Sequence, residues 1–177
     1  GRFLTAIEEL GERLAAGPEH DLLATGSVHA STINGGTEAS TYPDRCTIVV
    51  ERRTVPGEDA ATFAGELRGI LERIAADDPR FRFDVTITGH HSPFAAQPDS
   101  LIGRFLGEAV AAITGAPAAR GGEPFWTDCA LLADAGIDTV LFGVDGGGAH
   151  AAEEWVTLDS LRTVTDALTE AVIRFTR

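Results

Sequence analysis

The 177-residue chain has no methionine, one tyrosine, two cysteines and few basic residues, 14 against 27 acidic ones. Cys46 and Cys129 provide neither a disulfide framework nor a CxxC spacing, so we expect two reduced, buried thiols. The net charge of −13 argues against a nucleic-acid partner, because phosphate binding is driven by clustered Lys and Arg. No apolar run reaches the length of a membrane span and no signal sequence is visible, so we expect a cytoplasmic protein without a membrane partner.

Hydrophobic residues make up 44% of the chain, which is enough for one core or two small ones. In the first half their period switches between helical and strand values. The predicted elements are helices over 3–14 and 63–74, a hairpin of strands over 28–32 and 46–50 with its turn at 34–36, and a third strand over 81–87. This pattern predicts an α+β layer whose antiparallel sheet has an edge suited to a further strand.

The second half changes character after Pro93. The predicted elements are helices over 101–113, 128–135 and 161–172, and a short strand, buried on both faces, over 138–142. One or two strands cannot bury these helices. We therefore expect this half to be part of a larger α/β domain whose other strands come from elsewhere.

A glycine-rich loop follows the short strand and carries one histidine, His150, after Gly146–Gly148. Glycines allow a backbone to approach a metal or substrate closely, and imidazole is the commonest protein ligand for zinc. Zinc needs three or four protein ligands, however, and neighbouring residues do not supply them. Both a metal ligand and a plain loop histidine remain open from these residues alone. His29, His90 and His91 are expected to be surface or strand-end residues.

Six motifs together carry a resemblance to a known family. In chain order they are Thr32–Thr37 (TINGGT), Tyr42–Cys46 (YPDRC), Glu51–Glu58 (ERRTVPGE), Trp126–Leu132 (WTDCALL), Ala135–Gly143 (AGIDTVLFG) and Ala149–Val156 (AHAAEEWV). Their order resembles the C-terminal half of the M20 metallopeptidases, which include acetylornithine deacetylases, succinyl-diaminopimelate desuccinylases and glutamate carboxypeptidases.

The resemblance implies a fold in two parts. Residues 1–94 would form most of the α+β lid, or dimerisation, domain: an antiparallel sheet with two helices, whose first strand is missing and would sit at the unpaired edge. Residues 95–177 would form the C-terminal part of an α/β zinc-peptidase-like catalytic domain. The family's other metal ligands and its general base have no match here, and a chain that starts with Gly1 and lacks methionine resembles a piece of a longer one.

For the complete protein, the resemblance implies a two-zinc amidohydrolase or exopeptidase acting on small N-acyl amino acids or dipeptide-like amides. Cobalt or manganese could replace zinc. We expect this chain alone to be inactive, because it matches one of the family's five metal ligands.

Several residues match the catalytic-domain site of the family. His150 matches the last metal ligand, and Glu154 matches a glutamate that supports the ligand loop by hydrogen bonding. Trp126, Thr127 and Gly147 match segments that line the substrate pocket.

On the lid, Arg53 matches an arginine that binds a substrate carboxylate, for which a guanidinium fork is suited. Arg52 is the weaker candidate, because strand alternation turns it to the other face. Ser40 stands where many relatives have an asparagine that contacts the scissile group. Asp128 is equally suited to capping the helix that begins there.

A second hypothesis belongs to a different class. The chain could be a non-catalytic dimerisation or interaction module, or a degenerate paralogue, since one matched ligand cannot hold two zinc ions. The enzyme hypothesis implies a small-molecule substrate with a carboxylate and a homodimer formed through the lid domain.

Overall fold

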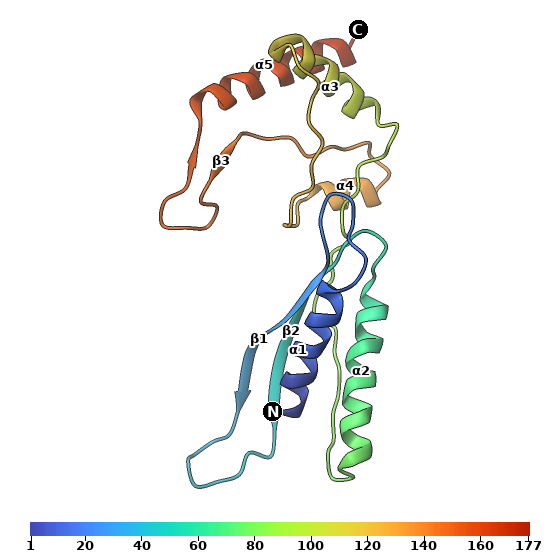
Figure 1. The fold of residues 1–177 in the computed structure, drawn as a ribbon, viewed down its shortest axis with the longest axis vertical. Helices are drawn as coiled ribbons and strands as arrows, with labels where there is room; N and C mark the ends of the chain where they lie inside the picture. Colours follow the sequence, from blue (N-terminus) through green and yellow to red (C-terminus); the bar gives the residue numbers. More distant parts are fainter. The chain divides into compact units, whose positions relative to one another are not determined.

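The computed structural model covers residues 1–177 and divides into two compact units, residues 1–93 with 122–124 and residues 94–121 with 125–177 (Figure 1). The first unit contains α1 (Arg2–Ala15), β1 (Ser27–Gly35), β2 (Cys46–Arg53) and α2 (Ala60–Asp77). The second contains α3 (Leu101–Thr114), α4 (Cys129–Asp134), β3 (Gly146–Gly147), β4 (Trp155–Val156) and α5 (Leu158–Phe175). None of the five helices is long and apolar enough to cross a lipid bilayer.

The core of the first unit lies between two helices and the hairpin. Its buried members are Ile7 and Leu10 from α1 and Leu67, Ile70 and Ile74 from α2. Each such side chain contributes about 1.5–3 kcal/mol relative to an exposed position. Both predicted helices are therefore confirmed, together with the apolar stripes that bury them.

The start of α2 follows from its sequence. Asp59 is the N-cap, and its Oδ1 accepts a hydrogen bond of 2.7 Å from the backbone N–H of Thr62. This bond satisfies one of the donors that a helix leaves free in its first turn. It also holds the pKa of Asp59 below its ordinary value.

The predicted hairpin is confirmed as an antiparallel pair of β1 and β2. Ser27 lies opposite Arg53 at one end and Gly35 lies opposite Cys46 at the other, with a bulge between Ala30 and Thr32. The turn is longer than the predicted 34–36, because β1 continues through Gly35 and the connection occupies residues 36–45.

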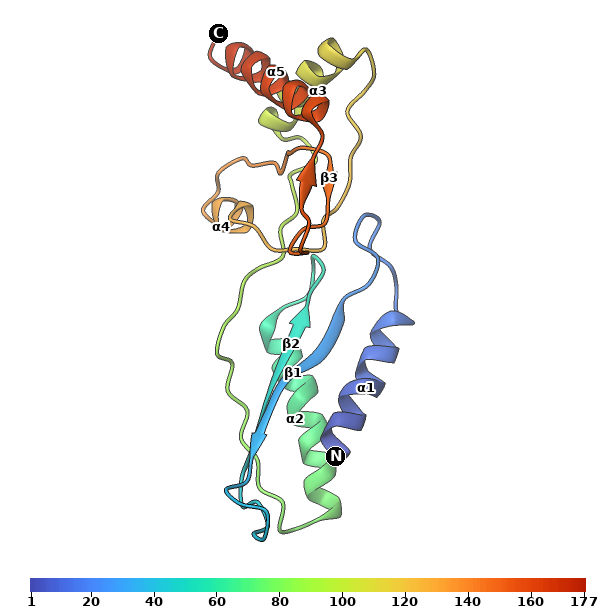
Figure 2. The same ribbon diagram turned by 90° about the vertical axis from the view of Figure 1, so that its left-hand side faces the viewer.

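The prediction of a third strand over 81–87 is wrong, because these residues make no strand pairing. Residues 81–87 form no strand, although they run alongside the rest of the unit (Figure 2). Phe81 and Val85 pack against the core, whereas Phe83 and Ile87 are 39% and 42% exposed. The alternation predicted that all four apolar residues share one inward face, and this is confirmed only for Phe81 and Val85. A strand also needs a neighbour to pair with.

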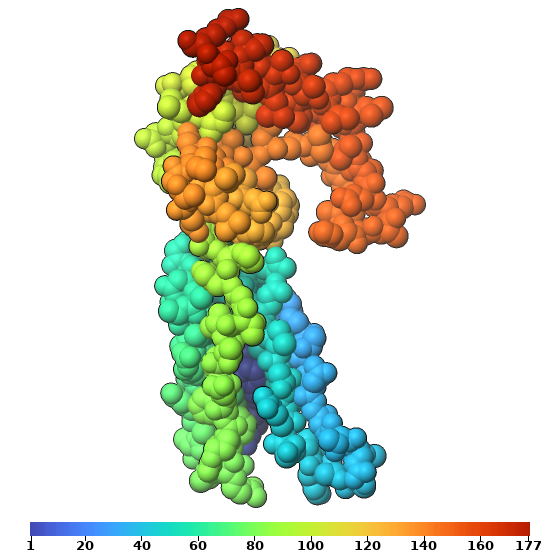
Figure 3. All heavy atoms as spheres, turned by 180° about the vertical axis from the view of Figure 1, so that it is seen from behind, coloured from blue at the N-terminus to red at the C-terminus, as the bar shows by residue number.

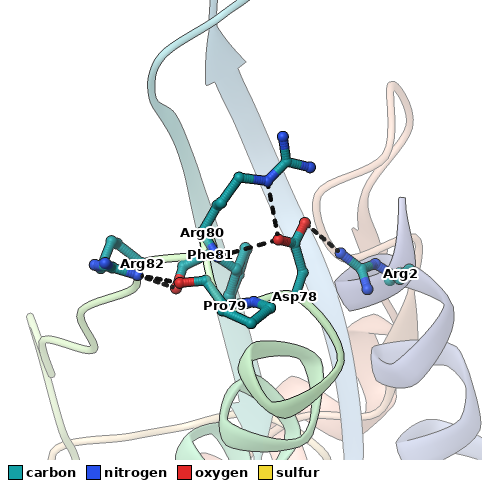
Figure 4. Close-up of polar contacts among 6 residues, drawn as sticks. All are labelled: Arg2, Asp78, Pro79, Arg80, Phe81 and Arg82. Carbon is teal, nitrogen blue, oxygen red and sulfur yellow. Dashed lines mark hydrogen bonds and ion pairs between the residues drawn. The ribbon is translucent and has the colours of Figure 1, made fainter.

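A carboxylate joins the two helices of this unit at one end (Figure 4). Asp78, directly after α2, lies 3.7 Å from Nη2 of Arg2 in α1 and accepts a 3.1 Å hydrogen bond from the backbone N–H of Arg80. That backbone bond is the main reason why the pKa of Asp78 is lowered. Arg82 donates to the carbonyl of Pro79 at 2.6 Å. These arginines surround the negative end of α2, whose last turn has no basic residue.

In the second unit, α3 and α5 approach through small residues. Ala109, Ala167 and Ala171 are 0–2% exposed and form the core with Leu106. The predicted end of α3 is confirmed, since Gly115 adopts φ 74° as a left-handed C-cap. The helices predicted over 128–135 and 161–172 are also present, with slightly different bounds.

The strand predicted over 138–142 is wrong. These residues have no strand pairing, and only one side of the segment is covered: Val140 and Phe142 pack against the α3–α5 core, while Leu141 is 44% exposed. A buried parallel strand requires neighbours on both edges, and no strand of this chain pairs with the segment. The short β3–β4 hairpin was not predicted.

Candidate functional site

β3 and β4 lie so close together that Gly146 and Gly147 leave no room for side chains. Gly146 pairs with Val156 and Gly147 with Trp155. A Cβ on Gly146 would lie 2.2 Å from the carbonyl oxygen of Trp155, and one on Gly147 would lie 3.1 Å from its indole ring. Any side chain at Gly146 would therefore force the hairpin apart.

His150 lies in a tight turn at the tip of this hairpin. The backbone N–H of Ala151 donates to the carbonyl of Gly148 at 2.8 Å, which closes a four-residue turn. His150 is the third residue of the turn and has φ 62°, a left-handed conformation that is uncommon outside glycine. Its imidazole is exposed and makes no hydrogen bond within the chain. The turn thus presents an accessible nitrogen donor.

Glu154 belongs to the same loop, directly before β4. Its side chain is exposed and makes no hydrogen bond to His150 or to the loop backbone. The backbone of this segment is nonetheless held closely, because a Cβ on Gly148 would lie 2.0 Å from the carbonyl oxygen of Glu153. The support of the loop by the Glu154 carboxylate stays a prediction.

The donor side chains of this chain are dispersed. His, Cys, Asp and Glu side chains form no group of three that could hold a metal ion. The donors of residues 1–177 therefore do not by themselves fit a zinc site, for which three or four are needed. His150 fits the role of a single ligand.

Trp126 and Thr127 lie directly before α4. The hydroxyl of Thr127 accepts a hydrogen bond of 3.3 Å from the backbone N–H of Cys129. Asp128 occupies the N-cap position but makes no capping hydrogen bond, so the cap expected from its side chain is wrong. Trp126 is 39% exposed and Thr127 is half-buried. Thr127 therefore has a local structural role that the motif did not reveal.

On β2, Arg52 and Arg53 face opposite sides, as alternation predicts. The side chain of Arg52 is 6% exposed and forms an ion pair with Glu58, which also accepts a 3.0 Å hydrogen bond from the backbone N–H of Val55. The side chain of Arg53 is 54% exposed, and its Nε lies 2.5 Å from Oε1 of Glu51. Sequence reasoning missed both glutamates. The position of Glu51, two residues before Arg53 on one strand, was a usable signal.

Ser40 lies in the 36–45 connection, in a turn rather than on a strand, and it is exposed. Arg53 ends β2, whereas this connection precedes its first residue, Cys46 (Figure 1). At about 3.3 Å per residue, β2 alone separates its two ends by about 23 Å. Within one chain, Ser40 and Arg53 are too far apart to touch the same small substrate.

The remaining candidates are less informative. His29, His90 and His91 are exposed, as expected of surface residues. Both cysteines are free, but Cys46 is exposed and Cys129 is half-buried, so the prediction of two buried thiols is wrong. Cys46 begins β2 beside the exposed connection, where the helices do not cover it.

Two further polar side chains, Asp138 and Ser100, cap the first turn of α3, which the sequence patterns did not indicate. Asp138 Oδ2 accepts a 3.1 Å hydrogen bond from the backbone N–H of Ile102, and Ser100 Oγ accepts one of 2.9 Å from Gly103. A hydrogen bond from Ser100 is the largest reason why the pKa of Asp138 is lowered, and the bond from Ile102 is the next. Both groups satisfy donors in the first turn of α3. The segment after α4 is thereby anchored to α3.

Comparison with known proteins places the chain in a family. The sequence profile of peptidase family M20/M25/M40 matches residues 5–174. The acetylornithine deacetylase of Myxococcus xanthus is 28% identical over 185 residues, which cover 99% of this chain and 45% of the deacetylase. An M20 family metallo-carboxypeptidase from Sulfolobus solfataricus has a similar fold, with a TM-score of 0.56 at 18% identity over 94% of this chain and 41% of the carboxypeptidase.

The chain thus spans less than half the length of each of these two relatives. The family profile, by contrast, extends over nearly all of its residues, including both units and the His150 hairpin. The chain belongs to peptidase family M20/M25/M40.

Proposed function

We propose that residues 1–177 are the C-terminal portion of a metal-dependent amidohydrolase or exopeptidase that acts on small N-acyl amino acids or dipeptide-like amides. The observation that carries the proposal is the presentation of His150: an exposed imidazole at the tip of a closed turn, at φ 62°. The turn holds the imidazole outward, where a metal ion can reach it. The family match and the deacetylase relative support the same reaction class.

In this proposal His150 is one ligand of a divalent metal site, with zinc as the metal and cobalt or manganese as possible substitutes. The remaining ligands and the general base come from polypeptide outside residues 1–177. A divalent ion held there would supply Lewis-acid chemistry, which polarises an amide carbonyl and activates a water molecule. The chain by itself is inactive, because it does not supply a complete site.

Arg53 binds the carboxylate of the substrate. Its guanidinium is exposed, and Glu51 contacts it through Nε. The two Nη groups therefore remain available to a carboxylate in a bidentate arrangement. Arg52 cannot take this role, because its side chain is buried against Glu58.

Ser40 has a role in the same reaction only if a second copy of the chain is present. Because β2 separates Ser40 from Arg53 by about 23 Å, the two residues serve two different sites. A homodimer formed through the first unit would bring Ser40 of one copy to the site of the other. Its hydroxyl would then donate one hydrogen bond to the reacting carbonyl, where many relatives use an amide.

The test uses the complete gene product. After removal of metal by a chelator, zinc, cobalt or manganese is restored, and hydrolysis of N-acetyl amino acids and dipeptides is measured. We expect activity to require a divalent ion and to be lost in His150→Ala, with retention in the matched control His29→Ala, which changes an exposed histidine on β1. A complete product without metal-dependent hydrolysis would instead favour the interaction-module hypothesis.

A further inference from the structure

The loop between α1 and β1, residues 16–26, contains a turn that is organised by one histidine. The backbone N–H of His20 donates to the carbonyl of Ala24 at 2.6 Å, and that of Leu23 donates to the carbonyl of His20 at 3.2 Å. The backbone N–H of Leu22 donates to Nδ1 of the His20 imidazole, also at 3.2 Å. Ala24 ends the turn at φ 56°, a left-handed conformation that is unfavourable for a residue with a Cβ. His20 thus takes part in each of these hydrogen bonds.

The last residue of this loop lies against the end of β2 that carries Arg53. A Cβ on Gly26 would lie 2.8 Å from the carbonyl oxygen of Arg53 and 3.0 Å from Oε2 of Glu58. The next residue, Ser27, lies opposite Arg53 in the hairpin. Figure 3 shows β2 in cyan, running upward from the 36–45 connection at the bottom of the first unit. The loop therefore contacts β2 at the end opposite to that connection.

The turn of the same loop lies against residues 122–124. These residues belong to the first unit, although the chain before and after them belongs to the second. A Cβ on Gly122 would lie 2.6 Å from the carbonyl oxygen of Leu22 and 2.6 Å from Cδ2 of Leu23. Any side chain at Gly122 would therefore force the two segments apart.

We infer that residues 16–26 position two substrate contacts of the proposed enzyme, Arg53 and the segment 126–127. The inference rests on the proposed function, in which Arg53 binds the substrate carboxylate, and on the match of residues 126–127 to a segment that lines the substrate pocket. One end of the loop contacts the backbone of Arg53, and its turn contacts Gly122, shortly before residues 126–127. A displacement of a binding group by about 1 Å can cost about 100-fold in rate. His20 is therefore a positioning residue, which acts through the turn that it organises.

The first test is the hydrolysis of an N-acetyl amino acid by the complete gene product with its metal restored. Gly122→Ala places a methyl group against the carbonyl of Leu22, and Gly121→Ala is the matched control, because nothing lies within 4 Å of a Cβ there. We expect Gly122→Ala to raise KM by about 10- to 100-fold and to change kcat by less than about 3-fold, since substrate binding is weakened rather than the chemical step. An unchanged KM in Gly122→Ala, or an equal rise in Gly121→Ala, would overturn the inference.

Substitution of His20 tests the hydrogen bond that holds the turn. In His20→Asn the side-chain oxygen can accept from the backbone N–H two residues on, so the bond to Leu22 is kept. We expect His20→Ala to raise KM by about 10-fold and His20→Asn to return it to within about 3-fold of the natural value. His29→Ala, which changes an exposed histidine on β1, should leave KM unchanged. An unchanged KM in His20→Ala, or an equal rise with alanine and asparagine, would overturn the role of His20.

Amide hydrogen exchange gives a readout that does not depend on catalysis. We expect the amides of Leu22 and Leu23 to exchange more slowly than those of the exposed 36–45 connection. The Leu22 amide should lose this protection in His20→Ala and keep it in His20→Asn. Unprotected amides at both positions in the natural protein would overturn the inference and leave the proposed function intact. Protected amides in a protein without metal-dependent hydrolysis would instead overturn the proposed function, and with it the link between this loop and a substrate.

Discussion

Arg52 and Arg53 are consecutive residues of β2 with opposite surroundings: the side chain of Arg52 is 6% exposed and paired with Glu58, while that of Arg53 is 54% exposed beside Glu51. The alternation of the strand produces this difference. It separates a structural arginine from one that can meet a ligand, although the two have the same chemistry.

The first prediction concerns Arg52. We expect Arg52→Ala to lower the free energy of unfolding by about 2 kcal/mol, because it leaves Glu58 without its charged partner. Arg53→Ala should change it by less than about 1 kcal/mol, since an exposed pair contributes little. Urea unfolding of the two variants compares them. An equal loss of unfolding free energy in both variants would contradict the buried position of Arg52 and the exposed position of Arg53.

The second prediction concerns His150. Both His150→Ala and His150→Gly should lower the affinity of the complete protein for the metal by at least about 100-fold, because loss of a residue that only orients a ligand already costs up to about 100-fold. The glycine variant should be more stable than the alanine variant by about 1 kcal/mol, because φ 62° costs alanine more. Metal content by mass spectrometry and thermal unfolding after chelation measure the two effects. Full metal occupancy in either variant would exclude His150 as a ligand.

The third prediction concerns the hairpin that carries His150. In Gly148→Ala the new methyl group would lie 2.0 Å from the carbonyl oxygen of Glu153, at φ 73°. We expect a local destabilisation of about 1–3 kcal/mol and a loss of bound metal, although Gly148 is not itself a ligand. The control is Gly65→Ala on the exposed face of α2, where nothing lies within 4 Å. That change should stabilise the protein by about 1 kcal/mol and leave metal binding unchanged.

The fourth prediction concerns Asp138 and pH. Hydrogen bonds from Ser100 and Ile102 hold its pKa below the ordinary 3.8. A lowered pKa in the folded state gives stability that is present above 3.8 and is lost as the pH falls through the folded value. Asp138→Asn should therefore lower the melting temperature at pH 7, and the difference from the natural protein should shrink below pH 3.8. A difference that is constant from pH 7 to pH 3 would contradict the role of the charge.

Local patterns were sufficient to predict all five helices. The spacing of apolar residues such as Ile7 and Leu10 determines which face of a helix is buried. Capping residues determine where a helix begins or ends, as Asp59 does for α2 and Gly115 for α3. The hairpin was also predictable, because β1 and β2 are close in sequence and pair with each other.

Strands that need distant partners were not predictable. The segments 81–87 and 138–142 have strand-like alternation or apolarity but no pairing neighbour in this chain. Contacts over long separations, such as Asp138 with Ile102, were equally hidden. Among the candidate residues, the outward face of Arg53 followed from alternation, whereas the left-handed turn at His150 did not, since several backbone conformations suit the sequence GGGAH.

The most direct test of the proposed function is the kcat/KM of the complete gene product for an N-acetyl amino acid and for the matching N-acetyl amino-acid amide, which lacks the carboxylate. We expect Arg53→Ala to lower kcat/KM for the acid by about 10- to 100-fold, the equivalent of a charged hydrogen-bonded pair, and to leave the value for the amide unchanged. Arg80→Ala, whose side chain is 93% exposed, is the matched control and should change neither. An unchanged preference for the acid over the amide in Arg53→Ala would contradict the assignment of Arg53 to the substrate carboxylate.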